Sequence, residues 1–286
     1  MTLLAGRKCF RALEPLHSMV YFAPETQEEL VAAGLEKSRM CYFAGRAAPL
    51  GPVGAGVVAA TFYNFSPSLV ARHIPRAWTL ATPEAVTAAR LRAVDAVQRR
   101  LLGDALASAD MAEAAELALR ATEACAPAGR PLYAAHAQLD RPEEPHLAFW
   151  HAVTLLREYR GDGHLAVLLG AELDGLEALV THCATGKGFL PDFARASRGW
   201  SDAEWDAAVV RLRDRGLLDA DGALTPEGVE LRRHIEHATD RLDRAPYAHL
   251  GEDGTVRLAG IAVDLTTRAL SAGAFPDGVF AAPGRR

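Results

Sequence analysis

The stretch from Trp200 to Leu231 constrains the fold more than any other part of the chain. Ser201 and Glu204 have the spacing of a capping box, in which each side chain satisfies a backbone amide at the start of a helix. That helix ends at Gly216, and Asp221-Gly222 is a hairpin signal between two short apolar segments. A threonine-proline pair then opens another helix. This order predicts a helix, a short two-stranded wing and a second helix.

The composition predicts a mainly α protein. The chain has 286 residues, of which 50% are hydrophobic and 23% are charged, as in an ordinary globular protein of one or two domains. Alanine and leucine dominate and β-branched runs are few, which favours helices over sheet. Hydroxyl-proline pairs at Ser66-Pro67 and Thr82-Pro83 each predict the start of a helix.

Charge and hydropathy bear on the partners and the location. The net charge of -5 gives no overall attraction to nucleic acid or to an anionic membrane. No uncharged run reaches transmembrane length, and the N-terminus lacks the apolar region of a signal peptide. The four cysteines are too widely spaced for a zinc site or a disulfide framework. We therefore expect a cytoplasmic protein with no membrane partner.

Most of the chain before the wing reads as a helical scaffold. Residues 83–103 and 109–126 are amphipathic and alanine-rich, with arginine and glutamate expected on their outer faces. Further helices are expected over 146–159 and 163–185, separated by a turn at Gly161-Asp162-Gly163.

We expect three parts in sequence order. Residues 1–188 form a helical ligand-binding domain, with catalysis left open, and residues 189–275 form the winged-helix-like module with long C-terminal helices. Residues 276–286 are expected to be a loose tail.

Two parts of the opening stretch carry a family resemblance. They read Leu212-Arg213-Asp214-Arg215-Gly216-Leu217-Leu218 and Leu224-Thr225-Pro226-Glu227-Gly228. Together they resemble the MarR-type winged helix-turn-helix, in which such segments join the recognition helix, the wing and a long helix. The resemblance implies a module for reading DNA, for packing or for forming a homodimer. The whole chain also resembles a family of actinobacterial helical proteins with such a module, and this likeness implies no particular activity.

The acidic residues of this stretch argue against DNA as a partner. A recognition helix places its N-terminal residues at base edges and phosphates. Here those residues include Asp202, Glu204 and Asp206, which repel phosphate. The expected wing is short and carries Asp219 and Asp221 near its tip. We therefore interpret the module as a winged helix that does not bind DNA.

A different function remains open for the same module. In this alternative the protein is a ligand-responsive transcription regulator of the MarR type. It would need a basic surface, for example from Lys187, Arg195 and Arg198.

Polar groups within apolar helices of the N-terminal part predict a small-molecule pocket. His17 and Tyr21 are one turn apart, and so are Tyr42 and Arg46. A third group of aromatic and amide side chains comprises Phe62, Tyr63, Asn64 and Phe65. If these helices pack together, they enclose an aromatic-lined cavity with a few convergent polar groups.

The predicted roles are those of a ligand-binding protein, with enzyme activity left open. As an enzyme it would perform cofactor-free acid/base chemistry such as isomerisation, cyclisation or elimination. His17 would be the base or acid, and Tyr21 or Tyr63 the proton donor. Arg46 would anchor a carboxylate or enolate. The remaining predicted ligand contacts are Tyr42, Phe62, Asn64 and Phe65.

A purely structural explanation competes with each of these roles. His17 and the aromatic residues fit a hydrogen-bonded, apolar core equally well. Arg46 fits an ion pair with Glu14 or Glu25, and Asn64 fits a helix cap. A protein that serves only as a structural partner is therefore a third hypothesis.

No cofactor and no metal are expected. The glycines of residues 49–56 lack the lysine and the preceding strand of a phosphate-binding loop. His146 and His151 are five residues apart and do not share a helix face, so no metal-binding spacing is present.

Overall fold

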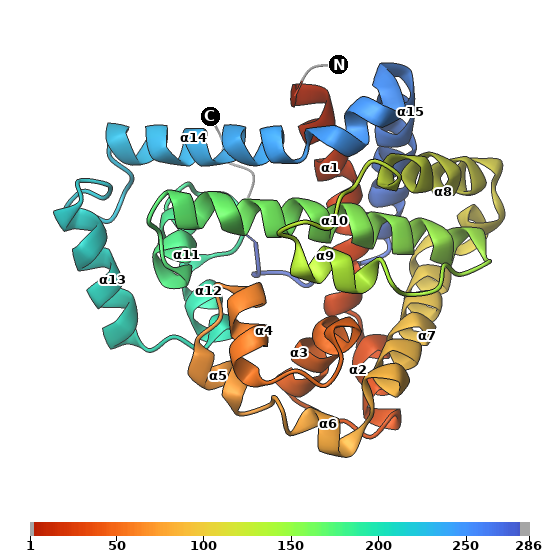
Figure 1. Cartoon of the computed structure of the whole chain (residues 1–286), viewed down its shortest axis with the longest axis horizontal. Helices are drawn as coiled ribbons and strands as arrows, with labels where there is room; N and C mark the ends of the chain where they lie inside the picture. Colours follow the sequence, from red (N-terminus) through yellow and green to blue (C-terminus); the bar gives the residue numbers. More distant parts are fainter. Residues whose placement is uncertain (1–2, 281–286) are drawn as a thin grey trace. The chain divides into compact units, whose positions relative to one another are not determined.

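The computed structural model describes residues 3–280, and this part of the chain is mainly helical (Figure 1). It contains α-helices and short 3-10 turns and no strand longer than an isolated bridge. These residues fall into two compact units. Unit 1 contains residues 3–53, 73–163 and 240–275, and unit 2 contains residues 54–72, 164–239 and 276–280. Each unit is therefore assembled from three separate segments.

Unit 1 is built from helices at both ends of the chain. Its helices are α1 (Leu3–Ser18), α2 (Pro24–Ala32), α3 (Arg39–Ala47), α6 (Ala77–Leu80), α7 (Pro83–Leu102), α8 (Ala109–Thr122), α9 (Pro131–His136) and α15 (Arg244–Ser271). The first part of α10 (Pro145–Gly170) also belongs to it. α15 packs against α1 and α8, while α2 and α3 pack against α7. The core lies among them, with Leu13, Val97, Met111 and Phe149 fully buried.

Local sequence signals start several of these helices. The Thr82 side chain accepts a hydrogen bond from the amide of Ala85, and proline occupies the first position of α7. Ser108 caps α8 in the same way through the amide of Met111. The predicted helix start at Ser66-Pro67 is also present, at the beginning of α5 (Pro67–Ala71).

Unit 2 is smaller and has its own core. Its helices are α4 (Ala55–Phe62), α5, α11 (Gly175–Cys183), α12 (Pro191–Arg198) and α13 (Asp202–Asp214), with the end of α10 and most of α14 (Pro226–Leu242). α11 packs against α12 and α13. Its core includes Leu176, Ala208, Leu212 and Ile235, all of which are buried.

A helix-turn-helix lies within unit 2. α12 ends at Arg198 and α13 begins at Asp202, so three residues form the turn. Gly199 adopts a positive φ of 73°, and a Cβ there would lie 2.8 Å from the side chain of Leu69. The predicted capping box is present, because the Ser201 side chain accepts from the Glu204 amide and the Glu204 carboxylate accepts from the Ser201 amide.

The predicted two-stranded wing is reduced to a single bridge. In the described residues Leu218 and Leu224 form an isolated antiparallel bridge, and no strand extends from it. The amide of Asp219 donates to the carbonyl of Ala223 over 2.9 Å. The Asp219 side chain accepts from the amides of Asp221 and Ala223, which closes the loop on itself. Because these bonds form a tight turn, few residues remain to pair as strands.

The predicted turn at Gly161-Asp162-Gly163 is wrong. α10 continues through it as one helix from Pro145 to Gly170. The Asp162 carboxylate accepts from the amide of Tyr133, and a Cβ at Gly163 would lie 2.7 Å from a guanidinium nitrogen of Arg130. Gly163 therefore allows a close approach of Arg130 to the helix surface instead of ending the helix.

Two further expectations concern the division of the chain. The linear boundary between residues 1–188 and 189–275 stays a prediction. Of the expected tail at 276–286, residues 281–286 lie outside the described part of the chain.

Within residues 3–280, no helix combines the length and the apolar character needed to cross a membrane.

Candidate ligand-binding site

Arg90 is the centre of the candidate site in unit 1. It lies four residues after Val86 and four before Val94, both of which are completely buried on α7. The helix therefore carries the guanidinium inward, and only 5% of the residue is exposed. The expectation that the arginines of this helix lie on its outer face is wrong at this position. In the sequence, the four-residue spacing of Arg90 from each of these valines indicates that its side chain points inward.

Neutral groups hold Arg90 in place. Its Nη2 donates to the hydroxyl of Tyr21 over 3.1 Å, and its Nη1 lies 3.1 Å from Nε2 of His136. The guanidinium carbon lies 4.8 Å from the centre of the Trp150 ring, within the range of a cation–π contact. Among residues 3–280 no carboxylate lies within ion-pair distance of Arg90. Its charge is therefore not neutralised by a direct partner.

The hydrogen bonds of His136 define its tautomer. Nδ1 lies 2.8 Å from the carbonyl oxygen of Leu132, to which it must donate, so Nε2 is the acceptor for Arg90. Burial, and next the charge of Arg90, lower the pKa of His136 to about 4. The imidazole is therefore neutral at physiological pH and does not compete with an anion for Arg90.

A buried carboxylate nearby is fully engaged by two other arginines. Glu158 is 1% exposed and accepts two hydrogen bonds from Arg46, at 3.2 and 2.8 Å, and one from Arg157 at 2.9 Å. Burial alone would raise the pKa of Glu158, but Arg46 and Arg157 hold it well below its usual value. Glu158 is therefore ionised, and it forms ion pairs with both Arg46 and Arg157.

Several charged groups surround the half-buried Tyr21 in unit 1. Arg46, Arg90 and Arg157 all act electrostatically on it. The carboxylates nearby are Glu158, the half-buried Glu14, which lies 3.6 Å from Arg157, and Asp162, which interacts electrostatically with Arg46 and Glu158. None of these carboxylates pairs directly with Arg90, so an anion bound beside Arg90 would supply the partner that it lacks among the described residues.

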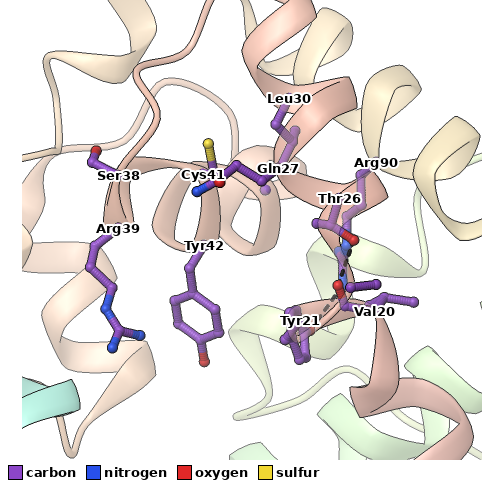
Figure 2. Close-up of a pocket in the computed structure, with 12 residues that line it drawn as sticks. Val20, Tyr21, Thr26, Gln27, Leu30, Ser38, Arg39, Cys41, Tyr42 and Arg90 are labelled. Atoms are coloured by element: carbon purple, nitrogen blue, oxygen red, sulfur yellow. Dashed lines mark hydrogen bonds between the residues drawn. The ribbon is translucent and has the colours of Figure 1, made fainter. Parts of the chain in front are cut away.

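A pocket of about 270 Å³ opens beside Arg90. Figure 2 shows the Tyr42 ring between the Arg39 guanidinium and the Tyr21 ring, with Arg90 hydrogen-bonded to Tyr21. We call it the first pocket, and it is lined by Val20, Tyr21, Ala23, Thr26, Gln27, Leu30, Ser38, Arg39, Cys41, Tyr42, Gly45 and Arg90. These described lining residues include two arginines and no carboxylate.

Four of the predicted site residues lie close together in unit 1. Tyr21 and Tyr42 line the first pocket, with ring centres 5.3 Å apart. Arg46 pairs with Glu158 rather than with Glu14 or Glu25. Its predicted role as a ligand anchor stays a prediction, and the arginines that line the first pocket are Arg39 and Arg90.

His17 is completely buried and does not line the first pocket. Its ring stacks on Trp150 at 5.2 Å and meets the Tyr21 ring edge-on at 5.5 Å. Within residues 3–280, neither ring nitrogen has a hydrogen-bond partner. Burial, followed by the charges of Arg157 and Arg90, lowers its pKa well below the usual value. His17 is therefore a neutral imidazole with an unused donor and an unused acceptor.

The other four predicted residues belong to unit 2. The Tyr63 hydroxyl donates to the carbonyl of Leu173, and the Asn64 carbonyl accepts from the indole of Trp200 over 2.9 Å. Phe62 and Phe65 are buried, with ring centres 6.3 Å apart. These contacts are internal to unit 2, and a ligand role for the four residues stays a prediction.

The arginines of α13 are engaged within unit 2. Arg211 pairs with Asp174 at 2.9 Å and Glu177 at 2.8 Å, and Arg215 also pairs with Glu177. Arg213 donates to two backbone carbonyls of the loop after α13. The acidic start of α13 stays exposed, and its Asp202 pairs with Arg195 at 3.0 Å.

A comparison with protein families agrees with the turn between α12 and α13. The chain belongs to a helix-turn-helix family, whose model matches residues 6–276. No curated protein and no solved structure matches the chain. In the described residues, no group of three or more histidine, cysteine or acidic side chains is arranged to hold a metal ion.

Proposed function

We propose that unit 1 binds a small organic anion in the first pocket. The observation that carries this proposal is Arg90, a buried guanidinium that lines a pocket and has no carboxylate partner among the described residues. Burying an unbalanced charge is costly, and a bound anion would recover that cost. Arg39 at the exposed side adds a second positive charge for the same ligand.

The pocket supports a ligand with a small aromatic or aliphatic body. Its volume of about 270 Å³ is near the lower end of typical ligand sites. Tyr21 and Tyr42 present ring faces and hydroxyls, and Leu30 supplies an apolar wall. A monocyclic carboxylate is the simplest molecule with this combination of charge, size and flat surface.

Matched carboxylates and amides test the proposal. Benzoate and 4-hydroxybenzoate should bind at least tenfold more tightly than their amides in calorimetric titrations at low salt. Arg90→Met should abolish that preference, because it removes the charge and keeps an apolar stem. Arg92→Gln is the control, since Arg92 lies on the same helix but is exposed. Equal binding of acid and amide to the unaltered protein would overturn the proposal.

We also infer an acid/base role for His17 and Tyr21 toward the bound anion. The unpartnered nitrogens of His17 and its contact with Tyr21 support it. Because His17 does not line the first pocket, it would act through Tyr21, which does. In D2O, this pair would exchange the C–H proton next to the carboxylate of bound phenylacetate, which NMR measures directly. His17→Phe should abolish exchange without abolishing binding. Absence of exchange under saturating phenylacetate would count against this role.

For unit 2 we infer a winged helix of the MarR type that no longer contacts DNA. The acidic, exposed start of α13 and the internal pairing of its arginines support this inference. The family assignment is compatible with the alternative, a ligand-responsive regulator that binds DNA. A gel shift with genomic fragments at 50 mM salt separates the two. No retention at micromolar protein is expected, and retention that weakens with added salt would favour the regulator.

A further inference from the structure

A second pocket shares Arg90 with the first. It has a volume of about 400 Å³ and is lined by Ala48, Pro49, Gly51, Pro83, Glu84, Thr87, Ala88, Arg90, Leu91, His136, Leu139, Asp140, Pro142, Trp150, His151 and Thr154. The lining comes from α7, α9, α10 and the loops beside them, all within unit 1.

In the second pocket, the positively charged lining residue is buried and the negatively charged ones are exposed. Arg90 and His136 are 5% and 2% exposed and form its buried part. Glu84 and Asp140 are exposed and lie on the solvent side. Among the described lining residues, Arg90 is the only lysine or arginine. The lining residues of the second pocket therefore offer a positive charge in the interior and negative charges on the solvent side, where the exposed Arg141, which does not line the pocket, acts on His151. The first pocket is lined by arginine at both places.

Apolar and neutral groups separate these charges. Leu91, Leu139 and Pro142 supply aliphatic surface, and Trp150 supplies an aromatic one. His151 is half-buried and has no hydrogen-bond partner among the described residues. Burial, and next the charge of Arg141, lower its pKa, so it offers a neutral ring nitrogen to a ligand.

We propose that the second pocket binds a zwitterionic small molecule, with a carboxylate at one end, an ammonium group at the other and an apolar body between them. The carboxylate meets Arg90 in the interior, and the ammonium group meets Glu84 and Asp140 at the mouth. This site is distinct from the first pocket. Because one guanidinium serves both, a carboxylate bound in one pocket weakens the binding of a carboxylate in the other.

Three related compounds test the charge pattern. 4-(Aminomethyl)benzoate carries both charges, 4-methylbenzoate only the carboxylate, and 4-methylbenzylamine only the ammonium group. Calorimetry at low salt should show that the zwitterion binds at least threefold more tightly than either singly charged compound. Equal affinity of the zwitterion and 4-methylbenzoate would overturn the proposal.

Variants at the mouth of the second pocket test whether its carboxylates account for the tighter binding of the zwitterion. Glu84→Gln with Asp140→Asn should lower the zwitterion's affinity threefold to tenfold and leave that of 4-methylbenzoate unchanged. Glu143→Gln is the matched control, because Glu143 is exposed in the same loop as Asp140 but does not line the pocket. Unchanged zwitterion affinity in the double variant, or an equal loss in the control, would overturn the proposal.

A blocking variant separates this site from the first pocket. Ala88 lines only the second pocket and is exposed on α7, so Ala88→Trp can fill the cavity without entering the core. It should lower the zwitterion's affinity to that of 4-methylbenzoate in the same variant, because both compounds can then bind only through their carboxylates in the first pocket, and it should preserve benzoate binding there. A zwitterion that still binds more tightly than 4-methylbenzoate in this variant would overturn the proposal. Failure of the unaltered protein to prefer benzoate over its amide bears on the first pocket alone.

Discussion

Two buried arginines of unit 1 are stabilised in opposite ways. Arg46 is paired with a carboxylate and is part of the internal structure. Arg90 is held by a phenol, a neutral imidazole and an indole ring, and so keeps a charge that a ligand can use. The difference between the paired Arg46 and Arg90, for which we propose ligand binding, lies in the partner, since both side chains are largely buried.

Removing the carboxylate of Glu158 should strongly destabilise unit 1. Glu158→Gln leaves Arg46 and Arg157 facing each other without an anion, and breaking a buried pair costs about 3–5 kcal/mol. Urea denaturation measures the change in the free energy of unfolding. Glu29→Gln is the control, because its pair with Arg92 is largely exposed and should cost less than about 1 kcal/mol. Similar losses in both variants would contradict the structural role assigned to Glu158.

Asp243 should make stability depend on pH. Burial raises its pKa to about 7, although Arg160 lies 3.1 Å away and opposes the shift. The folded state therefore holds a proton more tightly than the unfolded state does. The resulting stabilisation is complete below about pH 4 and is lost as the pH rises through about 7, at no more than about 1.4 kcal/mol per pH unit.

Melting temperatures at pH 5 and pH 8 test this sign. The buried His17 and His136 have lowered pKa values and act in the opposite direction over this range, so the test compares two proteins. The melting temperature at pH 8, relative to that at pH 5, should be higher in Asp243→Asn than in the unaltered protein, because asparagine does not ionise. Asp162, whose pKa burial raises to about 6, acts in the same direction as Asp243 in both proteins. An unchanged difference in Asp243→Asn would contradict the assignment.

Gly216, after α13, and Gly228, in the first turn of α14, are required for different physical reasons. Gly216 has a positive φ of 70°, which a residue with a side chain rarely adopts. At Gly228, a Cβ would lie 2.2 Å from the carbonyl oxygen of Leu217, so the first turn of α14 packs directly on the preceding backbone. The spacing of these glycines therefore follows from the tight loop between the two helices.

Gly228→Ala should disturb this element. The added methyl group meets backbone, which cannot move aside as a side chain can, and a loss of about 1–3 kcal/mol is expected. Gly260→Ala in α15 is the control, because a methyl group added there would meet open space and helix propensity favours alanine by about 1 kcal/mol. Denaturation curves that show equal gains in both variants would contradict the predicted clash.

Sequence signals predicted the helix ends well and the tertiary contacts poorly. Caps at Thr82 and Ser201 act over three residues, so the sequence displays them directly. The partners of Arg90 come from α9 and from the turn after α1, and no local pattern joins them. The predicted turn at Gly161-Asp162-Gly163 is wrong because a glycine in a turn and a glycine at a close packing contact, such as Gly163, look alike in the sequence.

At the scale of the whole molecule, the module expected at 189–275 depends on distant residues. The amide of Ser66 donates to the carbonyl of Arg198 over 2.9 Å, and Trp200 donates to Asn64. Gly199 packs closely against Leu69. The helix-turn-helix is therefore incomplete without residues 54–72, which the linear division assigns to the other domain.

A fragment of residues 189–275 should fail to fold on its own. It lacks α11, α4 and α5, and so exposes the core residues Ala208 and Leu212. Circular dichroism should show reduced helicity and no cooperative melting. A second polypeptide that joins residues 54–72 to 164–239 through a glycine linker restores these partners and should regain a melting transition. Cooperative melting of the short fragment would contradict this dependence.

Because each unit is assembled from three separate segments, the order of synthesis limits when each unit can fold. Residues 54–72 leave the ribosome well before the partners that begin at residue 164, and α1 must wait for α15, the last helix among the described residues. Domains usually fold in turn as they emerge. Here neither unit has all of its described segments until the residues after 239 have been synthesised, so α1 stays without α15 until then.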